Sequence, residues 1–241
     1  MALGMERDYH LRWMDFDQYG RLQPFALLDM CQDVATLQAE EMGIGHDEML
    51  ARGVFWVVVR QKFEVIRNPR HFQTVTVRTW PHTPTRFSFQ RDFAMRDEQG
   101  ELLAKMTSEW VLVNEQTRKF ASVKDYYVPT DDYDEARAFE RKPRKIADFP
   151  EGNRPPVTMT PSYSDIDLNG HVNNARYADY VVNALNPGAE GAVKSFQIDY
   201  RHEVLPGVPF VMHTLVEDGT VRSKGVREDG TIAFASLIEL R

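Results

Sequence analysis

An internal repeat constrains the fold of this chain more than any other feature. Residues 15–21 (DFDQYGR) and 165–171 (DIDLNGH) share two aspartates and a glycine at an offset of 150 residues, and Asp29 then falls on Asp179. Each segment leads into a helical pattern and then into alternating strands. The sequence therefore predicts two copies of one folding unit.

Both copies have the same predicted order of elements. In the first, apolar residues at helical spacing predict a helix over 23–42, with Pro24 near its start and Gly43 as its stop. Runs rich in β-branched and aromatic residues predict strands over 54–65, 74–80, 87–96 and 102–113. The second copy predicts a strand at 157–163, a helix ending at Leu185, and strands over 193–201, 209–217, 220–227 and 231–240.

A helix that must bury its apolar stripe on an antiparallel sheet is an α+β arrangement. Two such sheets placed edge to edge cover each other's unpaired strands and leave room for an apolar tunnel between helix and sheet. Residues 128–156 are rich in proline and charge and show no sustained period, which indicates a linker. We expect domains over 1–127 and 156–241, joined by a linker over 128–155.

Composition excludes several classes of protein. The chain has 241 residues, of which 42% are hydrophobic, enough for a real core. It has no apolar run long enough for a bilayer and no signal peptide, so we expect a cytoplasmic protein without membrane insertion. Its net charge of −7 argues against a nucleic-acid binder. The single cysteine, Cys31, lies in a helical pattern and is expected to pack in the core.

The second copy carries the candidate chemistry. Residues 163–175 place a carboxylate, an amide and an imidazole directly before a helical segment, whose free N–H groups can hold a carbonyl oxygen as it gains negative charge. This pattern favours acyl chemistry. A calcium loop is disfavoured because Arg176 stands at its twelfth place, where a bidentate Glu is required. The remaining alternative is a turn whose polar side chains only cap the helix.

At this point the sequence resembles a known family, the acyl-acyl carrier protein thioesterases, which are tandem hotdog-fold enzymes. The resemblance covers nearly the whole chain. It depends on four segments, of which the first is the most specific: 165–174 (DIDLNGHVNN), 107–111 (TSEWV) with Asn114, Thr117 and Arg118, 78–80 (RTW), and 200–203 (YRHE). It implies a double hotdog, with two copies of a long helix wrapped by an antiparallel sheet.

The resemblance also implies a catalytic set, carried over by matching position: Asp167, Asn169, His171 and Glu203. In this hypothesis Glu203 is the general base for water, Asn169 and His171 position water and substrate, Asp167 orients its neighbours, and backbone N–H groups near Val172 and Asn173 hold the oxyanion. Alternation along the strand before Glu203 would point its side chain with the polar set, so we expect a bulge or strand end near His202.

Two departures accompany this assignment. Plant members carry a cysteine after the glutamate, where this chain has Val204, so direct attack by water is favoured over a covalent intermediate on that residue. In the first copy Tyr19 and Arg21 replace Asn169 and His171, and aligning Pro69 with Pro206 places Ile66 opposite Glu203. The first copy is therefore expected to bind the acyl chain without reacting.

The partner implied is an acyl carrier protein bearing a fatty acyl phosphopantetheine, and the product is a free fatty acid. Four cations at Arg141, Lys142, Arg144 and Lys145 are candidates for carrier docking, although such a run is usually a solvated linker. No motif suggests a metal or other cofactor. Alternatives are a coenzyme A thioesterase or a dehydratase on the same fold, and a non-catalytic acyl-binding regulator. A homodimer is left open, and the lack of a plastid extension favours a bacterial protein.

Overall fold

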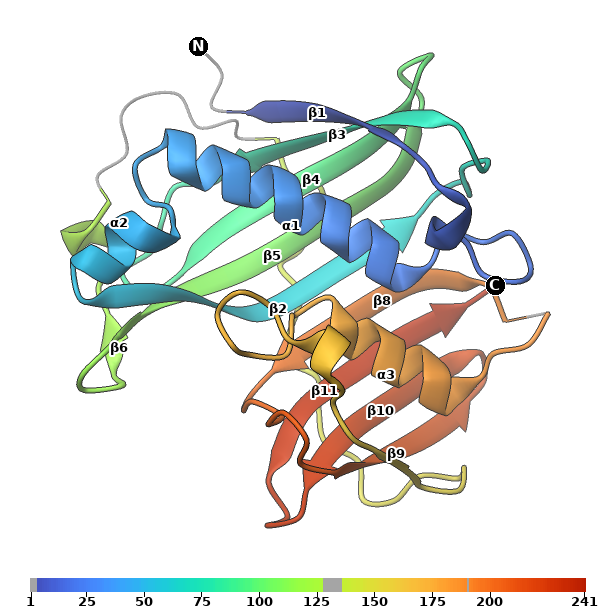
Figure 1. The fold of residues 1–241 in the computed structure, drawn as a ribbon. Helices are drawn as coiled ribbons and strands as arrows, with labels where there is room; N and C mark the ends of the chain where they lie inside the picture. Colours follow the sequence, from blue (N-terminus) through green and yellow to red (C-terminus); the bar gives the residue numbers. More distant parts are fainter. Residues whose placement is uncertain (1–3, 128–135, 190) are drawn as a thin grey trace.

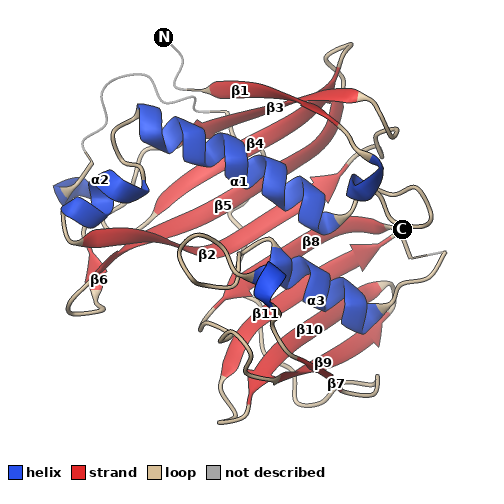
Figure 2. Ribbon diagram, in the orientation of Figure 1, coloured by secondary structure: helices blue, strands red, loops and turns tan. Residues whose placement is uncertain are grey.

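A computed structural model describes residues 4–127, 136–189 and 191–241. These residues form one antiparallel sheet of 11 strands, and the two long helices lie on the same face of it (Figures 1 and 2). The helices are α1 (Pro24–Glu41), α2 (His46–Ala51) and α3 (Arg176–Leu185). The strands are β1 (Met5–His10), β2 (Val54–Val65), β3 (Thr74–Pro81), β4 (Phe89–Asp97), β5 (Leu102–Asn114), β6 (Phe120–Ala121), β7 (Val157–Met159), β8 (Val193–Tyr200), β9 (Phe210–Glu217), β10 (Thr220–Arg227) and β11 (Ile232–Leu240).

The two halves of the chain join through their sheets. The strand order is β1-β3-β4-β5-β2-β8-β11-β10-β9-β7, with β6 paired to β5. Strand β2 of the first half pairs antiparallel with β8 of the second, from Arg60 opposite Asp199 to Glu64 opposite Ser195. Two edges that would otherwise expose unpaired backbone groups thus cover each other, as the sequence predicts.

The repeat is confirmed at the level of backbone hydrogen bonds. A 3-10 turn at Trp13–Asp15 recurs at Tyr163–Asp165, and isolated bridges link Phe16 to Leu22 and Ile166 to Val172. The N–H of Asp17 donates to the carbonyl of Arg21 at 2.8 Å, and the N–H of Asp167 donates to the carbonyl of His171 at 2.9 Å. Each of these pairs has the offset of 150 residues.

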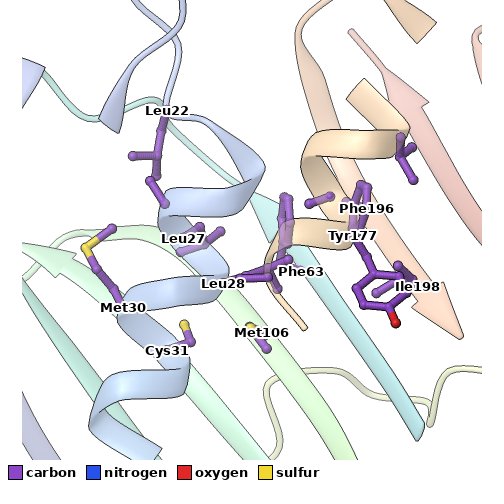
Figure 3. Packing of buried hydrophobic residues seen from close by; sticks show 14 of the residues in the cluster. Leu22, Leu27, Leu28, Met30, Cys31, Phe63, Met106, Tyr177, Phe196 and Ile198 are labelled. Atoms are coloured by element: carbon purple, nitrogen blue, oxygen red, sulfur yellow. The ribbon is translucent and has the colours of Figure 1, made fainter. Parts of the chain in front are cut away.

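A shared apolar core lies between the helices and the sheet. Figure 3 shows side chains from α1, including Leu27 and Leu28, close to others from the strands and from α3. At the junction of the halves, the rings of Phe63 on β2 and Phe196 on β8 stack with centroids 5.4 Å apart. Since both rings are buried, this contact stabilises the seam by apolar burial and by aromatic packing.

Most predicted elements are present, with small shifts at their ends. Helix α1 begins at Pro24 and is followed by Gly43 at φ +66°, as predicted. The strand expected over 157–163 is shorter than predicted, because β7 covers only Val157–Met159 and a 3-10 turn occupies Tyr163–Asp165. Pro161 between them lacks an N–H group to extend the ladder. The sequence missed α2 and β6, which are both short.

The later part of the linker lies on the sheet face opposite the helices. The N–H of Ile146 donates to Asp199 Oδ2 at 2.7 Å, and Gln197 Nε2 donates to the carbonyl of Arg144 at 2.7 Å. On β8 these polar side chains alternate with Phe196 and Ile198, which face the core. The first part of the expected linker, 128–135, lies outside the described residues. Within the part of the chain that the structure describes, none of the helices is both long and apolar enough to cross a membrane.

Candidate functional site

The candidate loop of the second half is held by its own backbone and by Asp167. The N–H of Asn169 donates to Asp167 Oδ1 at 2.9 Å, and the N–H of Gly170 donates to the carbonyl of Asp167 at 3.0 Å. Gly170 has φ +74°, a conformation that favours glycine. This tight turn projects His171 into solvent just before α3 begins. Asp167 therefore orders the backbone of the loop, and its role in orienting the neighbouring side chains stays a prediction.

The imidazole of His171 and the carboxylate of Glu203 converge. Nε2 of His171 lies 3.9 Å from Oε1 of Glu203, and the two side chains are 55% and 60% exposed. The distance is within reach of an ion pair but too long for a direct hydrogen bond. The pair is thus accessible to substrate, and a small movement of either side chain would admit a water molecule between them.

A β-bulge directs Glu203 toward the loop. Strand β8 ends at Tyr200, and the N–H groups of Arg201 and His202 both donate to the carbonyl oxygen of Ala233, at 2.9 and 2.8 Å. Two successive donors to one acceptor place an extra residue in the strand and bend it. The bulge expected near His202 is therefore present, and it breaks the alternation that would have carried Glu203 to the opposite face.

The other aspartate of the loop has a structural role. Asp165 Oδ2 accepts hydrogen bonds from the N–H of Ser162 at 2.7 Å and from the hydroxyl of Tyr180 at 2.8 Å. These bonds tie the loop to the following helix.

Among the residues that the structure describes, no three His, Cys, Asp or Glu side chains come together as metal ligands.

The expected oxyanion donors differ from each other. The N–H of Asn173 donates to the carbonyl of Asp165 at 2.9 Å, so it is already used by the turn. This corrects the expectation for Asn173, whose side chain instead accepts the N–H of Ala175 at 2.9 Å. Within the described residues the N–H of Val172, which lies in the turn before α3, has no such bond, and it remains a candidate for the oxyanion.

In the first half the equivalent loop is closed by an arginine. Arg21 Nε lies 2.7 Å from Asp17 Oδ2, and Arg21 Nη2 donates to the carbonyl of Gly188 at 2.9 Å. The guanidinium also lies over the ring of Tyr19, 4.6 Å from its centroid. Arg21, which replaces His171, thus links the two halves, and Tyr19, which replaces Asn169, packs against its guanidinium.

The counterpart of Glu203 is Asn68 and not Ile66. In the first half the N–H groups of Ile66 and Arg67 both donate to the carbonyl of Leu103, which repeats the bulge at Arg201 and His202. The matching offset is therefore 135 residues, where the prolines had suggested 137. Asn68 Oδ1 accepts the N–H of Leu22 at 2.8 Å. The conclusion that the first half lacks a carboxylate at this position is unchanged.

Cys31 and the linker cations lie away from this site. Cys31 is buried in α1, and burial raises the pKa of its thiol well above its usual range, so it is unreactive. Of the four cations, Lys142 is paired with Glu109 and all four are exposed. Their segment contacts Gln197 on the sheet face opposite α3, whereas His171 lies at the start of α3. Carrier docking by Arg141, Lys142, Arg144 and Lys145 stays a prediction.

Sequence reasoning missed two tyrosines beside the site. The hydroxyl of Tyr177 on α3 accepts the N–H of Val204 at 3.3 Å, next to Glu203. The hydroxyl of Tyr200 lies 2.6 Å from Gln61 Oε1 and 2.9 Å from the carbonyl oxygen of Asn174. Both rings follow the apolar pattern of their elements, so the sequence indicates only core residues. Their polar contacts depend on how the elements meet.

Comparison with known proteins gives consistent matches over both halves. The acyl-ACP thioesterase N-terminal domain model matches residues 3–130, and the C-terminal domain model matches residues 154–229 (ACP, acyl carrier protein). The dodecanoyl-[acyl-carrier-protein] hydrolase of Umbellularia californica is 30% identical over 198 residues, which are 74% of this chain and 50% of the relative. The corresponding Cinnamomum camphora hydrolase is 28% identical over 226 residues, covering 86% and 56%. The chain thus spans about half the length of these curated relatives.

Two solved structures have the same fold along nearly their whole length. The 12:0-ACP thioesterase from Umbellularia californica superposes with a TM-score of 0.86 at 24% identity, covering 100% of this chain and 98% of that one. An acyl-ACP thioesterase from Bacteroides thetaiotaomicron gives a TM-score of 0.86 at 23% identity, covering 99% and 98%. The fold is a double hotdog of the α+β class. On the two domain matches, this chain belongs to the acyl-ACP thioesterase family.

Proposed function

We propose that this protein hydrolyses fatty acyl-ACP thioesters to a free fatty acid and the holo-carrier. The observation that carries the proposal is the approach of His171 and Glu203 to 3.9 Å across the mouth of α3, in the half with the family motif. Thioester hydrolysis needs an activated water and a polarised carbonyl, and a thiolate leaves readily because its thiol is only a moderately weak acid. An imidazole and a carboxylate next to the unused N–H of Val172 meet these needs.

The proposed mechanism uses direct attack by water. Glu203 accepts the proton of the water, His171 and Asn169 hold water and substrate, and Asp167 orders the loop through its bond to the N–H of Asn169. The N–H of Val172, in the turn before α3, stabilises the oxyanion. Val204 is buried and apolar, so it can form no covalent intermediate.

The first half has the complementary role in this proposal. Its loop is closed by the Arg21–Asp17 ion pair, and its core between α1 and the sheet is apolar. We propose that it binds the acyl chain, within domain boundaries of 1–127 and 156–241 joined by 128–155. Each CH₂ buried would contribute about 0.8 kcal/mol, so the depth of this site sets chain-length preference.

Partners and location follow from the same proposal. The substrate partner is an acyl carrier protein bearing a fatty acyl phosphopantetheine, and we place the reaction in fatty acid biosynthesis in the cytoplasm. Reversing the charges at Arg141, Lys142, Arg144 and Lys145 should raise KM for the carrier-bound substrate and spare soluble thioesters. An unchanged KM for the carrier-bound substrate would rule out carrier docking at this segment.

The test is a hydrolysis assay on acyl-ACP thioesters of increasing chain length and on the matching coenzyme A thioesters, with the products identified by mass. The wild-type protein is expected to release free fatty acid, with higher kcat/KM on the carrier-bound series. Glu203→Gln and His171→Ala should each lower kcat by about 10² to 10⁴, the range for loss of an acid–base group.

Two exposed residues away from the loop supply matched controls, Glu228→Gln and His46→Ala. Both should retain wild-type turnover, since they make the same chemical changes elsewhere. Binding of acyl thioesters without any release of acid would replace hydrolysis by a non-catalytic binding role. Preference for the coenzyme A series would change the substrate, and an unsaturated product would indicate dehydration.

A further inference from the structure

Tyr177 lies at the point where helix and bulged strand meet behind the candidate site. It is the second residue of α3, is 4% exposed, and its ring contacts the rings of Tyr200 and Phe234 edge-on, with centroids 5.2 and 5.0 Å away. Figure 3 shows the side chain extending from α3 with its hydroxyl pointing away from the helix. The ring is therefore fixed by packing, and only the hydroxyl is left for polar contacts.

That hydroxyl is attached to the segment that carries Glu203. The N–H of Val204 donates to the Tyr177 oxygen at 3.3 Å, directly after Glu203 in the chain. At the other end of this segment, Arg201 and His202 are fixed by their shared bonds to Ala233. Glu203 is thus held from both sides, although its own side chain is exposed.

The proton of the hydroxyl is not used by this contact. A tyrosine hydroxyl has one donor and two acceptor sites, and the bond from Val204 occupies an acceptor. The pKa of Tyr177 is raised to about 12, mainly by burial and less by the charges of Glu203 and Asp167, against the opposing effect of the Val204 bond. The hydroxyl therefore stays protonated at neutral pH and has both carboxylates within electrostatic reach.

We propose that Tyr177 is a positioning residue of the reaction, which holds the Glu203 carboxylate beside His171. Its oxygen anchors the backbone directly after Glu203, which limits where the carboxylate of that residue can lie. The exposed Glu203 side chain makes its one ion pair among the described residues with His171, at 3.9 Å, so the backbone anchor beside it matters for its position. The proposal depends on hydrolysis for its kinetic consequences but not for its structural ones.

The first experiment does not require activity. The ring proton signals of His171 are recorded by NMR in the wild-type protein and in the variants Tyr177→Phe, Glu203→Gln and Tyr9→Phe. Tyr177→Phe keeps the ring and should move the His171 signals in the same direction as Glu203→Gln, because both weaken the contact with the carboxylate. Tyr9→Phe is the control, since it removes a partly buried hydroxyl bond to Asp33 in the first half. It should leave His171 unchanged.

The second experiment separates kcat from KM on an acyl-ACP thioester. Tyr177→Phe should lower kcat about tenfold with KM within about twofold, because it displaces a catalytic group and leaves the acyl site intact. In the Glu203→Gln background, Tyr177→Phe should cause no further loss, since the two residues act as one unit. The exposed control His46→Ala should change neither constant.

The outcomes distinguish this proposal from the proposed function. If wild-type protein is inactive on every thioester while the His171 signals move as expected, hydrolysis fails and the positioning role stands. If the His171 signals in Tyr177→Phe match the wild type, the positioning role is wrong whatever the activity. Additive losses in the double variant would likewise overturn it, since they indicate that Tyr177 acts independently of Glu203.

Discussion

Arg60 on β2 and Asp199 on β8 form an ion pair at the seam between the two halves, with Arg60 Nε 2.6 Å from Asp199 Oδ1. The Asp199 side chain is almost fully buried, and its other oxygen accepts the N–H of Ile146 in the linker. One carboxylate therefore joins both halves of the sheet and the segment that connects them. Removing a single member of such a group leaves an uncompensated buried charge.

Replacing Arg60 by methionine should therefore destabilise the protein by about 3 kcal/mol or more. Arg60→Met with Asp199→Leu should recover part of this loss, because the second change removes the unpaired carboxylate. Unfolding in urea, followed by tryptophan fluorescence, measures both variants. A loss below about 1 kcal/mol in Arg60→Met would indicate that the pair is well solvated and does not hold the seam.

Gly170 and Gly20 offer a matched test of the two loops. Both have a positive φ, +74° and +72°, and an added Cβ would meet no atom within 4 Å at either position. Substitution by alanine should therefore lower the free energy of unfolding by roughly 1 to 2 kcal/mol at either site, through backbone strain alone. Only Gly170→Ala should reduce kcat, because it distorts the loop of His171. Equal effects on kcat would show that the first-half loop also takes part in the reaction.

Arg21→Ala should weaken the contact between the halves without affecting chemistry. The guanidinium is paired with Asp17 and donates to the carbonyl of Gly188, so its loss should cost on the order of 1.5 to 3 kcal/mol. Arg52→Ala removes a more exposed pair with Glu48 and should cost at most about 0.5 kcal/mol. Thermal unfolding compares the two, with hydrolysis as the check that Arg21 is not catalytic.

The Asp148–Lys224 contact predicts a pH dependence of stability. The hydrogen bond from Lys224 is the main cause that lowers the pKa of Asp148 below its ordinary value of 3.8. The unfolded state therefore binds more protons in this range, and the contribution is present above about pH 4 and lost as pH falls below it. The urea midpoint of Asp148→Asn should lie below that of the wild type at pH 7, and the difference should shrink at pH 3. A constant difference would exclude this linkage.

The sequence located most elements because their local signals are strong. The β-branched run of β2 and the bounds of β10 were predicted without error, and α1 was found to within one residue at each end. The short elements α2, with six residues, and β6, with two, were not predicted because segments of this length show no reliable hydrophobic period. The alignment of Ile66 with Glu203 was wrong because it relied on Pro69 and Pro206. The equivalent bulges of the two halves set a different offset, and the prolines do not follow it.

The candidate site shows the same division. The family resemblance, carried by the motif before α3 and by the YRHE segment after β8, indicated Asp167, Asn169, His171 and Glu203 as candidates, because such motifs are local information. Which backbone N–H groups stay free to bind an oxyanion could not be predicted from the motif, because this depends on how the turn folds. Asn173 was expected to hold the oxyanion, but the turn uses its N–H for the carbonyl of Asp165.

The amino-acid sequence by itself determined the repeat, the order of helices and strands, and which half carries the candidate catalytic side chains, since these depend on residue types and on spacing along the chain. Only the tertiary structure decided that His171 and Glu203 meet at 3.9 Å, and that Tyr177 from α3 contacts Val204 beside them. The reason is that a strand bulge and the packing of a helix on a sheet set these distances, and both arise from contacts between residues far apart in the chain.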